Sequence, residues 1–239
     1  DLKIYFEDKA YIYKFQKSSD VLVLGTRMKS LVKNVKGKVI NADIENIPAN
    51  WEIVLKGIHN KENISCAIEV ARILKIPEKI IKKVVESFKA VSGRLELVKN
   101  IKGIEIYNDT NSCTPEAASV ALKALRFPPK PGLGEGIVLI MGGSDKNLDF
   151  NDLFKDIKKY AKAIVLIPGN GTDRVLSGLK KTSISIYQPK DLIGVVKQAY
   201  NIAHKGDIIL FSPAFTSFGM FNNEYDRGDK FMEIVKKLK

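Results

Sequence analysis

The second half of the chain alternates short, wholly apolar runs with amphipathic segments, and this alternation constrains the fold more than any other feature. Runs such as IVLIM (137–141) and AIVLI (163–167) are each followed by the three- and four-residue apolar spacing of a helix. A continuous apolar run is typical of a strand that is buried on both faces, as in a parallel sheet covered by helices. The pattern therefore predicts an α/β fold with a doubly wound, largely parallel sheet, in which ligands bind at the carboxyl ends of the strands.

The first part of the chain begins an alternation of helices and strands and continues in short segments. Its expected elements are a helix at 4–17, strands at 21–25 and 36–41, consecutive helices at 63–75 and 77–88, and a hairpin of strands at 94–100 and 103–109. Because the pattern changes at Ser92 and Gly93, we expect one domain at 1–92 and a second at 93–239.

Composition indicates a packed protein of ordinary type. The 239 residues are 45% hydrophobic and 28% charged, as in soluble globular proteins. No apolar stretch approaches the roughly 20 residues of a membrane helix, and the first residues mix charges where a signal peptide is apolar. We therefore expect a cytoplasmic protein with no membrane partner. Separately, the chain is expected to be a monomer.

The formal charge of +12 raises the question of nucleic-acid binding. The lysines stand singly or in pairs on apparent amphipathic helices, such as 78–89 and 154–162. This distribution favours a solvated basic surface, so no nucleic-acid partner is expected. The two cysteines, Cys66 and Cys113, are too few for a disulfide framework or a zinc site.

Polar loops follow three of the predicted strands. Asp109 ends one strand and is followed by a run of hydroxyl and amide residues before Pro115, which suits the first turn of a helix and predicts an anion site. After another strand, Ser212, Thr216 and Ser217 lie in FSPAFTSFG, where hydroxyls can bind a carboxylate or phosphate. Taken alone, such a serine-rich loop is usually only a loop.

The loop MGGSDKNLDF (141–150) is the third. Its glycines permit close approach of a ligand, and Lys146 can reach an anion. A glycine turn with Asp149 capping the next helix would also explain the pattern, but it leaves Lys146 without a role.

Other segments carry weaker signals. GLGEG (132–136) precedes a strand, and PGNGTDR (168–174) lacks a third glycine, so neither is a dinucleotide fingerprint and the second is interpreted as a plain loop. In HNKEN (59–63), Asn60 or Lys61 is expected in a turn and Asn63 as a cap before the helix at 63–75, with His59 as a structural histidine.

Taken in order, these segments resemble the Mur ligase family. The resemblance is carried by HNKEN, GRLELV, YNDTNSCTPEAA, LIMGGSDKNLDF and SPAFTSFGMFNNEYDRGDKF, which together extend over nearly the whole chain. It implies that residues 1–92 are the end of a central, P-loop-type ATPase domain and that 93–239 are a Rossmann-like carboxy-terminal domain that binds the amino acid. No GxxxxGK[ST] phosphate loop occurs in the sequence, so we interpret the chain as a fragment of the ligase.

The resemblance also implies roles for single residues. Asn60 and Asn63 would lie near the adenine of ATP, Arg94 near its phosphates and Asp109 at its ribose, and the implied cofactors are ATP and Mg²⁺. The implied substrate-binding residues are Lys146, Thr216 and Ser217, and Lys9 resembles a lysine that becomes a carbamate near magnesium. Three positions depart from the family: Asn111 stands where lysine is common, Cys113 where threonine is common, and Glu224 where an aromatic residue is common.

The implied activity is an ATP-dependent addition of D-glutamate to UDP-N-acetylmuramoyl-L-alanine through an acyl phosphate, a step of peptidoglycan synthesis. The alternatives are another Mur-type or folylpolyglutamate-type ligase and a noncatalytic basic α/β binding module.

Overall fold

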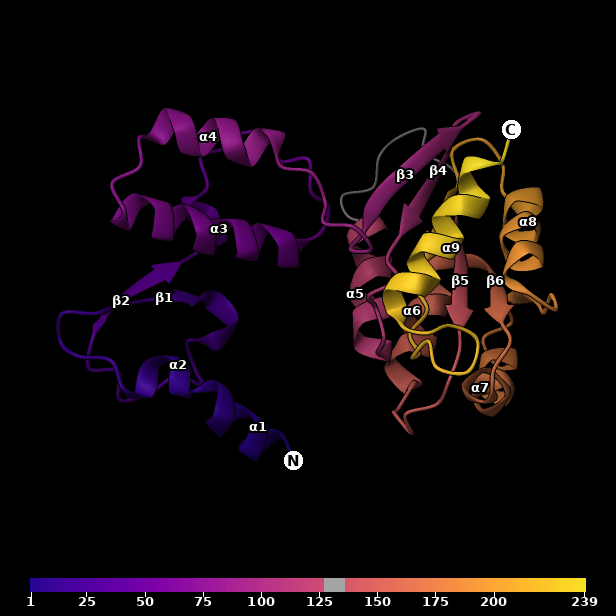
Figure 1. Cartoon of the computed structure of the whole chain (residues 1–239), viewed down its shortest axis with the longest axis horizontal. Coiled ribbons are helices and arrows are strands. Elements are labelled where there is room, and N and C mark those ends of the chain that lie inside the picture. The colour runs from indigo at the N-terminus through magenta and orange to yellow at the C-terminus, as the bar shows by residue number, and fades with distance from the viewer. Residues whose placement is uncertain (127–135) are drawn as a thin grey trace. The chain divides into compact units, whose positions relative to one another are not determined.

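The computed structural model describes residues 1–126 and 136–239 (Figure 1). The chain divides into two compact units, Asp1–Phe88 and Lys89–Lys239. The prolines and glycines of the segment 127–136 predict an exposed loop, but the segment lies outside the described residues except for Gly136, which directly precedes a strand.

The first unit contains a small parallel sheet with helices. Its strands β1 and β2 pair in parallel, with Val21 opposite Lys38. The buried side chains of Leu22 and Leu24 pack against Ala10 and Tyr13. The elements of this unit are α1 (Leu2–Lys9), α2 (Tyr11–Lys14), β1 (Val21–Gly25), β2 (Lys38–Ala42), α3 (Ile58–Ile73) and α4 (Glu78–Ser87), with short 3₁₀ turns at Thr26–Met28 and Ile44–Asn46.

Two expectations about these helices were wrong. The single helix expected at 4–17 begins earlier, because the Asp1 side chain caps it by accepting from the Ile4 amide, and it is interrupted at Ala10. Helix α3 begins at Ile58, five residues before the expected start at 63, so Asn60 and Asn63 lie inside it and are neither turn nor cap. Gly57, with a φ of 92°, allows the chain to enter the helix there.

The second unit is built on a six-stranded sheet within the described residues. The strand order is β3-β4-β8-β5-β6-β7. Only β3 and β4 pair antiparallel, and every other neighbouring pair is parallel, which confirms the predicted α/β fold with a largely parallel sheet. The strands are β3 (Glu96–Ile101), β4 (Ile104–Asn108), β5 (Ile137–Gly142), β6 (Ala161–Ile167), β7 (Ser185–Tyr187) and β8 (Ile208–Phe211).

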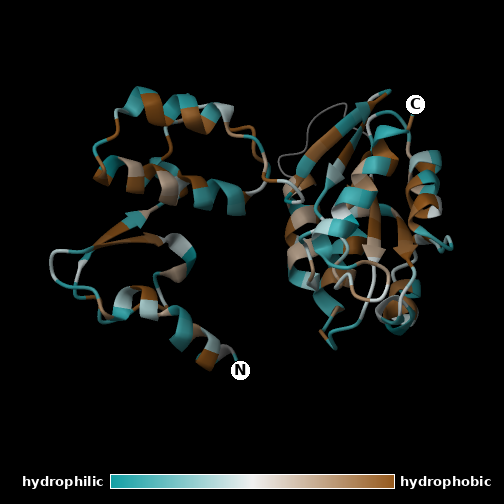
Figure 2. Ribbon diagram, in the orientation of Figure 1, coloured by the Kyte–Doolittle hydropathy of each residue, from teal (hydrophilic) through white to brown (hydrophobic). Residues whose placement is uncertain are grey.

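Helices cover both faces of this sheet, and the strand sequences explain why. In β5, Ile137, Leu139 and Met141 pack into one core, while Val138 and Ile140 pack into the other. Figure 2 shows these central strands as hydrophobic, whereas the helices present hydrophilic residues as well. The first core is shared with α5 (Pro115–Arg126), α6 (Asn151–Tyr160) and α7 (Asn170–Lys180), and the second with α8 (Leu192–Ile202) and α9 (Glu224–Lys236).

Strand β8 lies between β4 and β5, and this topology positions the candidate site. The chain leaves β4 and β5 for helices on one face and leaves β8 for α9 on the other. The pairing places Phe211, at the end of β8, beside Asn108 of β4 and Ile140 of β5. Such a reversal leaves a crevice at the carboxyl ends of the strands, where ligands bind in open α/β sheets. None of the helices in the described part of the chain is long and apolar enough to cross a membrane.

Replacement of Phe231 tests the second core. Its ring is fully buried in α9 and stacks on Phe211 with the centroids 4.1 Å apart. We expect Phe231→Ala to lower the free energy of unfolding by about 3–5 kcal/mol, because it removes a large buried side chain and leaves a cavity. Tyr225→Ala, which replaces a residue of the same helix that is 66% exposed, should change the free energy of unfolding by less than about 0.5 kcal/mol. Urea unfolding followed by far-UV circular dichroism gives both values, and equal effects would contradict this account of the core.

Candidate functional site

The carboxylate of Asp109 ties together the loops at the carboxyl edge of the sheet. It is 6% exposed and directly follows β4. Its Oδ2 accepts hydrogen bonds from the hydroxyls of Ser112 and Ser212, the latter at 2.9 Å, and its Oδ1 accepts from the Leu95 amide at 3.0 Å. The carboxylate therefore connects the start of the β3–β4 hairpin with the loops after β4 and β8.

Burial raises the pKa of Asp109 to about 6. The hydrogen bonds from Ser112, Ser212 and Leu95 and the positive charge of Arg94 act in the opposite direction but do not cancel the loss of solvation. Asp109 therefore changes charge close to neutral pH, unlike an exposed aspartate.

Arg227 of α9 is a buried cation that the sequence analysis did not identify. It is fully buried. Its Nη2 donates to the Thr110 carbonyl at 2.7 Å and contacts the Cys113 sulfur at 3.4 Å, and its Nη1 donates to the Phe215 carbonyl at 2.9 Å. No carboxylate within the described residues forms an ion pair with Arg227, and burial lowers its pKa. The guanidinium thus joins the loops after β4 and β8 through their main chains.

The structure brings the loop of Lys146 together with that of Thr216 and Ser217. Ser144 and Thr216 form an antiparallel bridge, in which the Ser144 amide donates to the Thr216 carbonyl at 3.0 Å. The Thr216 hydroxyl donates to the Ser144 carbonyl, also at 3.0 Å. The predicted ligand hydroxyl of Thr216 is therefore already used as a donor between the two loops.

Glycines make the close approach of these loops possible. A Cβ at Gly143 would lie 2.4 Å from the Thr216 carbonyl oxygen, and a Cβ at Gly169 would lie 2.4 Å from the Gly143 carbonyl oxygen. Both glycines also have positive φ, at 140° and 158°. Side chains at these positions would separate the loops after β5, β6 and β8.

Other predicted residues keep free polar groups. Lys146 and Arg94 are exposed, and neither side chain forms an ion pair or hydrogen bond within the described residues. Ser217 is 4% exposed, and its hydroxyl likewise has no partner in that part of the chain. Asp149 does not cap α6 in the usual way, since the N-cap is Phe150, but its carboxylate accepts from the Asn151 amide at 2.9 Å.

The remaining predicted residues lie in the first unit. Lys9 is exposed at the end of α1, with its ammonium 5.4 Å from the centre of the Tyr5 ring. The Asn60 amide donates to the Lys56 carbonyl at 2.8 Å across the start of α3, and Asn63 is exposed one turn later. His59, between them and Gly57, is half-buried, and burial lowers its pKa.

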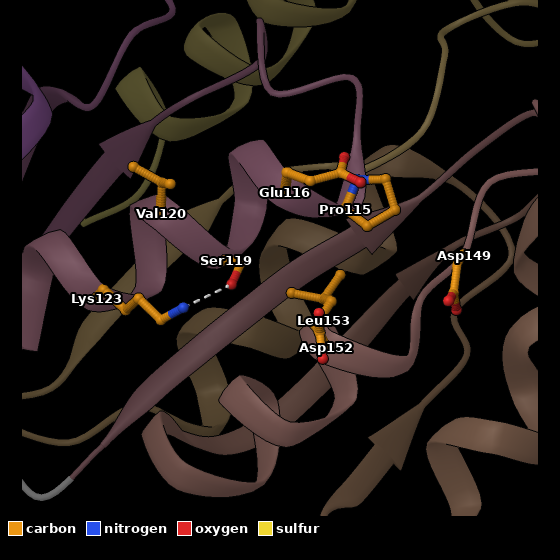
Figure 3. Close-up of a pocket in the computed structure, with 8 residues that line it drawn as sticks. All are labelled: Pro115, Glu116, Ser119, Val120, Lys123, Asp149, Asp152 and Leu153. Atoms are coloured by element: carbon orange, nitrogen blue, oxygen red, sulfur yellow. Dashed lines mark hydrogen bonds between the residues drawn. The ribbon is translucent and has the colours of Figure 1, made fainter. Parts of the chain in front are cut away.

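A separate pocket of about 310 Å³ lies between α5 and α6 (Figure 3). Its lining mixes acidic groups with Lys123, whose ammonium points to Ser119 and forms an ion pair with Asp156 at 2.8 Å. None of the predicted site residues lines it. The lining residues are Pro115, Glu116, Ser119, Val120, Lys123, Asp149, Asp152 and Leu153.

The sequence of this chain matches a known protein family and named relatives. The family described as "Mur ligase, glutamate ligase domain" matches residues 93–215. A UDP-N-acetylmuramoylalanine–D-glutamate ligase of Roseiflexus sp. (strain RS-1) is 39% identical over 190 residues, which cover 78% of this chain and 39% of that protein. The enzyme of the same name from Clostridium perfringens (strain 13 / Type A) is 32% identical over 266 aligned positions, covering 100% of this chain and 56% of that protein. The chain thus spans only part of the length of these relatives.

Solved structures share the fold. MurF ligase from Thermotoga maritima, in complex with ADP, has a TM-score of 0.67 at 20% identity and covers 98% of this chain and 57% of its own. MurF from Acinetobacter baumannii has a TM-score of 0.70 at 15% identity and covers 98% of this chain and 55% of its own. At such identities the likeness concerns the fold alone.

The raised pKa of Asp109 predicts a specific dependence of stability on pH. The folded state binds a proton more tightly than the unfolded state, so the stability that this group contributes is present below pH 4 and is lost as the pH rises through about 6. A tenfold change in proton affinity corresponds to about 1.4 kcal/mol. In urea unfolding, the free energy of unfolding of Asp109→Asn should therefore rise by up to about 2 kcal/mol relative to that of the wild type between pH 4.5 and pH 7. Parallel pH profiles for the two proteins would contradict the prediction.

Proposed function

This chain belongs to the Mur ligase family, and from that premise we propose that it forms part of an ATP-dependent ligase that adds D-glutamate to UDP-N-acetylmuramoyl-L-alanine. Its relatives carry the name of that activity. In this proposal residues 1–92 are the end of the central ATP-binding domain and residues 93–239 form the amino-acid-binding domain.

One observation in the second unit carries the proposal. The carboxyl edge of β5 and β8 presents an unpaired ammonium, Lys146, on a loop bridged to the one that holds Ser217, whose hydroxyl is also unpaired within the described residues. An ammonium and a hydroxyl are suitable donors for the carboxylates of an acidic amino acid. The Thr216 hydroxyl donates to Ser144, so we assign Thr216 the role of fixing the two loops and of offering its remaining lone pair.

The side chains that we propose for ATP binding are a guanidinium, a carboxylate and two amides. The exposed guanidinium of Arg94 forms no ion pair or hydrogen bond within the described residues. Burial raises the pKa of Asp109, and the positive charge of Arg94 lies near enough to oppose that rise. We propose that Arg94 binds the phosphates and that Asp109 accepts from the ribose hydroxyls with lone pairs left by its internal donors. For the adenine we propose Asn60 and Asn63 of α3, whose side-chain amides suit the edge of a base.

The proposed reaction passes through an acyl phosphate. The carboxylate of the precursor attacks the γ-phosphate of ATP and displaces ADP, and the amine of D-glutamate then attacks the acyl carbon and displaces phosphate. Arg94 would stabilise charge on the transferred phosphoryl group, and Lys146 with Ser217 would hold the amino acid so that its amine meets the carbonyl.

No group of three or more His, Cys, Asp or Glu side chains within the described residues is arranged to hold a metal ion. The proposal for Mg²⁺ therefore rests on Lys9, whose carbamate would carry a negative charge beside the metal.

Binding measurements can identify the amino acid that the proposed ligase adds. Asn111, Cys113 and Glu224 depart from the family pattern close to the proposed site, and Cys113 contacts Arg227. We therefore propose a panel of D-glutamate, L-glutamate, D-alanine and L-alanine, titrated into the chain by calorimetry. Tighter binding of another amino acid would contradict D-glutamate as the substrate and would favour the alternative Mur-type or folylpolyglutamate-type activity.

Replacement of Lys146 tests the proposed carboxylate contact. A charge-assisted hydrogen bond contributes about 1.5–3 kcal/mol, and about 1.4 kcal/mol corresponds to tenfold in affinity. We expect Lys146→Ala to raise the Kd for D-glutamate by roughly ten- to a hundredfold, Lys146→Arg to recover part of the loss, and the Kd for ATP to stay unchanged. Lys158→Ala, which removes an exposed lysine of α6, is the matched control. A shift of less than about threefold would assign Lys146 to the solvated surface.

A second test concerns ATP. The sequence contains no GxxxxGK[ST] phosphate loop, which supplies the amides and lysine that grip the β- and γ-phosphates in P-loop enzymes. We expect the chain alone to release ADP from ATP at no more than the background rate, measured by a coupled assay with Mg²⁺ present. ADP release above background that Arg94→Ala abolishes would overturn this prediction.

A further inference from the structure

We propose that Arg174 of α7 is the positioning residue for Lys146: it holds residues on both sides of Lys146 and so presents the ammonium to the carboxylate of the amino acid. The inference rests on the proposed function for the identity of the ligand, but the positioning itself can be measured without any ligand.

The guanidinium of Arg174 contacts the Lys146 loop at successive points. Its Nε lies 3.0 Å from Oδ2 of Asp145. Its Nη1 donates to Oδ1 of Asn147 at 3.3 Å, and its Nη2 donates to the Leu148 carbonyl at 2.7 Å. These partners flank Lys146 on both sides, while Lys146 itself is exposed and unpaired within the described residues.

The loop has a conformation that needs such support. Asn147 has a φ of 55°, in the left-handed region that non-glycine residues seldom adopt. The Asp145 carboxylate accepts from the Asn147 amide at 2.9 Å, and the same carboxylate pairs with Arg174. Arg174 therefore stabilises both the turn at Asn147 and the side chain that closes it.

The segment that carries Arg174 holds the other end of the loop as well. The Asn170 side chain accepts from the Asp145 amide at 3.1 Å, the Gly171 amide donates to the Gly143 carbonyl at 3.0 Å, and the Thr172 hydroxyl accepts from the Gly143 amide at 3.1 Å. The sequence of 168–174 predicts a plain loop, but residues from Asn170 onward form the first turn of α7. This turn is the support against which the Lys146 loop is folded.

Arginine suits this position better than lysine. A guanidinium donates in several fixed directions and can bind a carboxylate, an amide oxygen and a carbonyl together, whereas an ammonium is a compact point charge. The pair with Asp145 is partly exposed, with side-chain exposures of 37% and 23%, and exposed ion pairs contribute little to global stability. Loss of Arg174 should therefore loosen the loop without unfolding the domain.

The experiment compares the full chain with Arg174→Ala and Arg174→Lys, and with Lys180→Ala as a control that removes another exposed cation from α7. Hydrogen–deuterium exchange of peptides covering residues 143–150, followed by mass spectrometry, measures the order of the loop. Calorimetric titration with D-glutamate measures binding, in the wild-type background and in Lys146→Ala. We expect Arg174→Ala to exchange at least fivefold faster in this loop and to raise the Kd five- to tenfold, Arg174→Lys to be intermediate, and Lys180→Ala to match the wild type.

The double variant shows whether Arg174 acts through Lys146. In the Lys146→Ala background, Arg174→Ala should change the Kd by less than twofold, and an undiminished effect there would overturn the inference. Unchanged exchange in Arg174→Ala would overturn it regardless of binding. If Lys146→Ala binds D-glutamate as the wild type does while Arg174→Ala still accelerates exchange, the positioning role stands and the proposed carboxylate contact fails.

Discussion

The buried guanidinium of Arg227 is the interaction on which the geometry of the carboxyl edge depends. A buried charge is costly unless its hydrogen bonds are satisfied, and Arg227 satisfies them with carbonyls of Thr110 and Phe215. Those carbonyls belong to loops after β4 and β8, which come from distant parts of the chain. The helix α9 thereby fixes the distance between the loop that begins with Asp109 and the loop that contains Thr216 and Ser217.

The sheet beneath these loops supplies the rigidity that they need. Because both faces of β5 and β6 are fully covered, the ends of these strands have little freedom to move. Main-chain contacts between the loops, such as the bridge between Ser144 and Thr216, restrict the movement of the loops as well. A rigid edge of this kind lets a single exposed cation, Lys146, be held at a defined place on the surface.

The fold of the second unit could be predicted from the sequence because apolar runs and helical spacing are local patterns. The loops with Asp109, Lys146 and Thr216 could also be predicted to lie at one edge of the sheet. Arg227 could not be predicted, because a single arginine in DRGDKF looks like part of a solvated helical face until β4 and β8 are placed beside it. The start of α3 was missed because Gly57 and polar residues of HNKEN are typical of a turn, whereas the Asn60 side chain hydrogen bonds within the helix.

The contact of Gly143 with Gly169 and Thr216 has a consequence for how the preference of such a site can diverge. A side chain does not fit at Gly143 or Gly169, so a substitution at either glycine would push apart the loops after β5, β6 and β8. The spacing of these three loops therefore cannot change in small steps. Variation is confined to exposed side chains that project from the fixed backbone, such as that of Lys146. A laboratory search for altered amino-acid preference is therefore better directed at libraries of these projecting positions than at the length or glycine content of the loops.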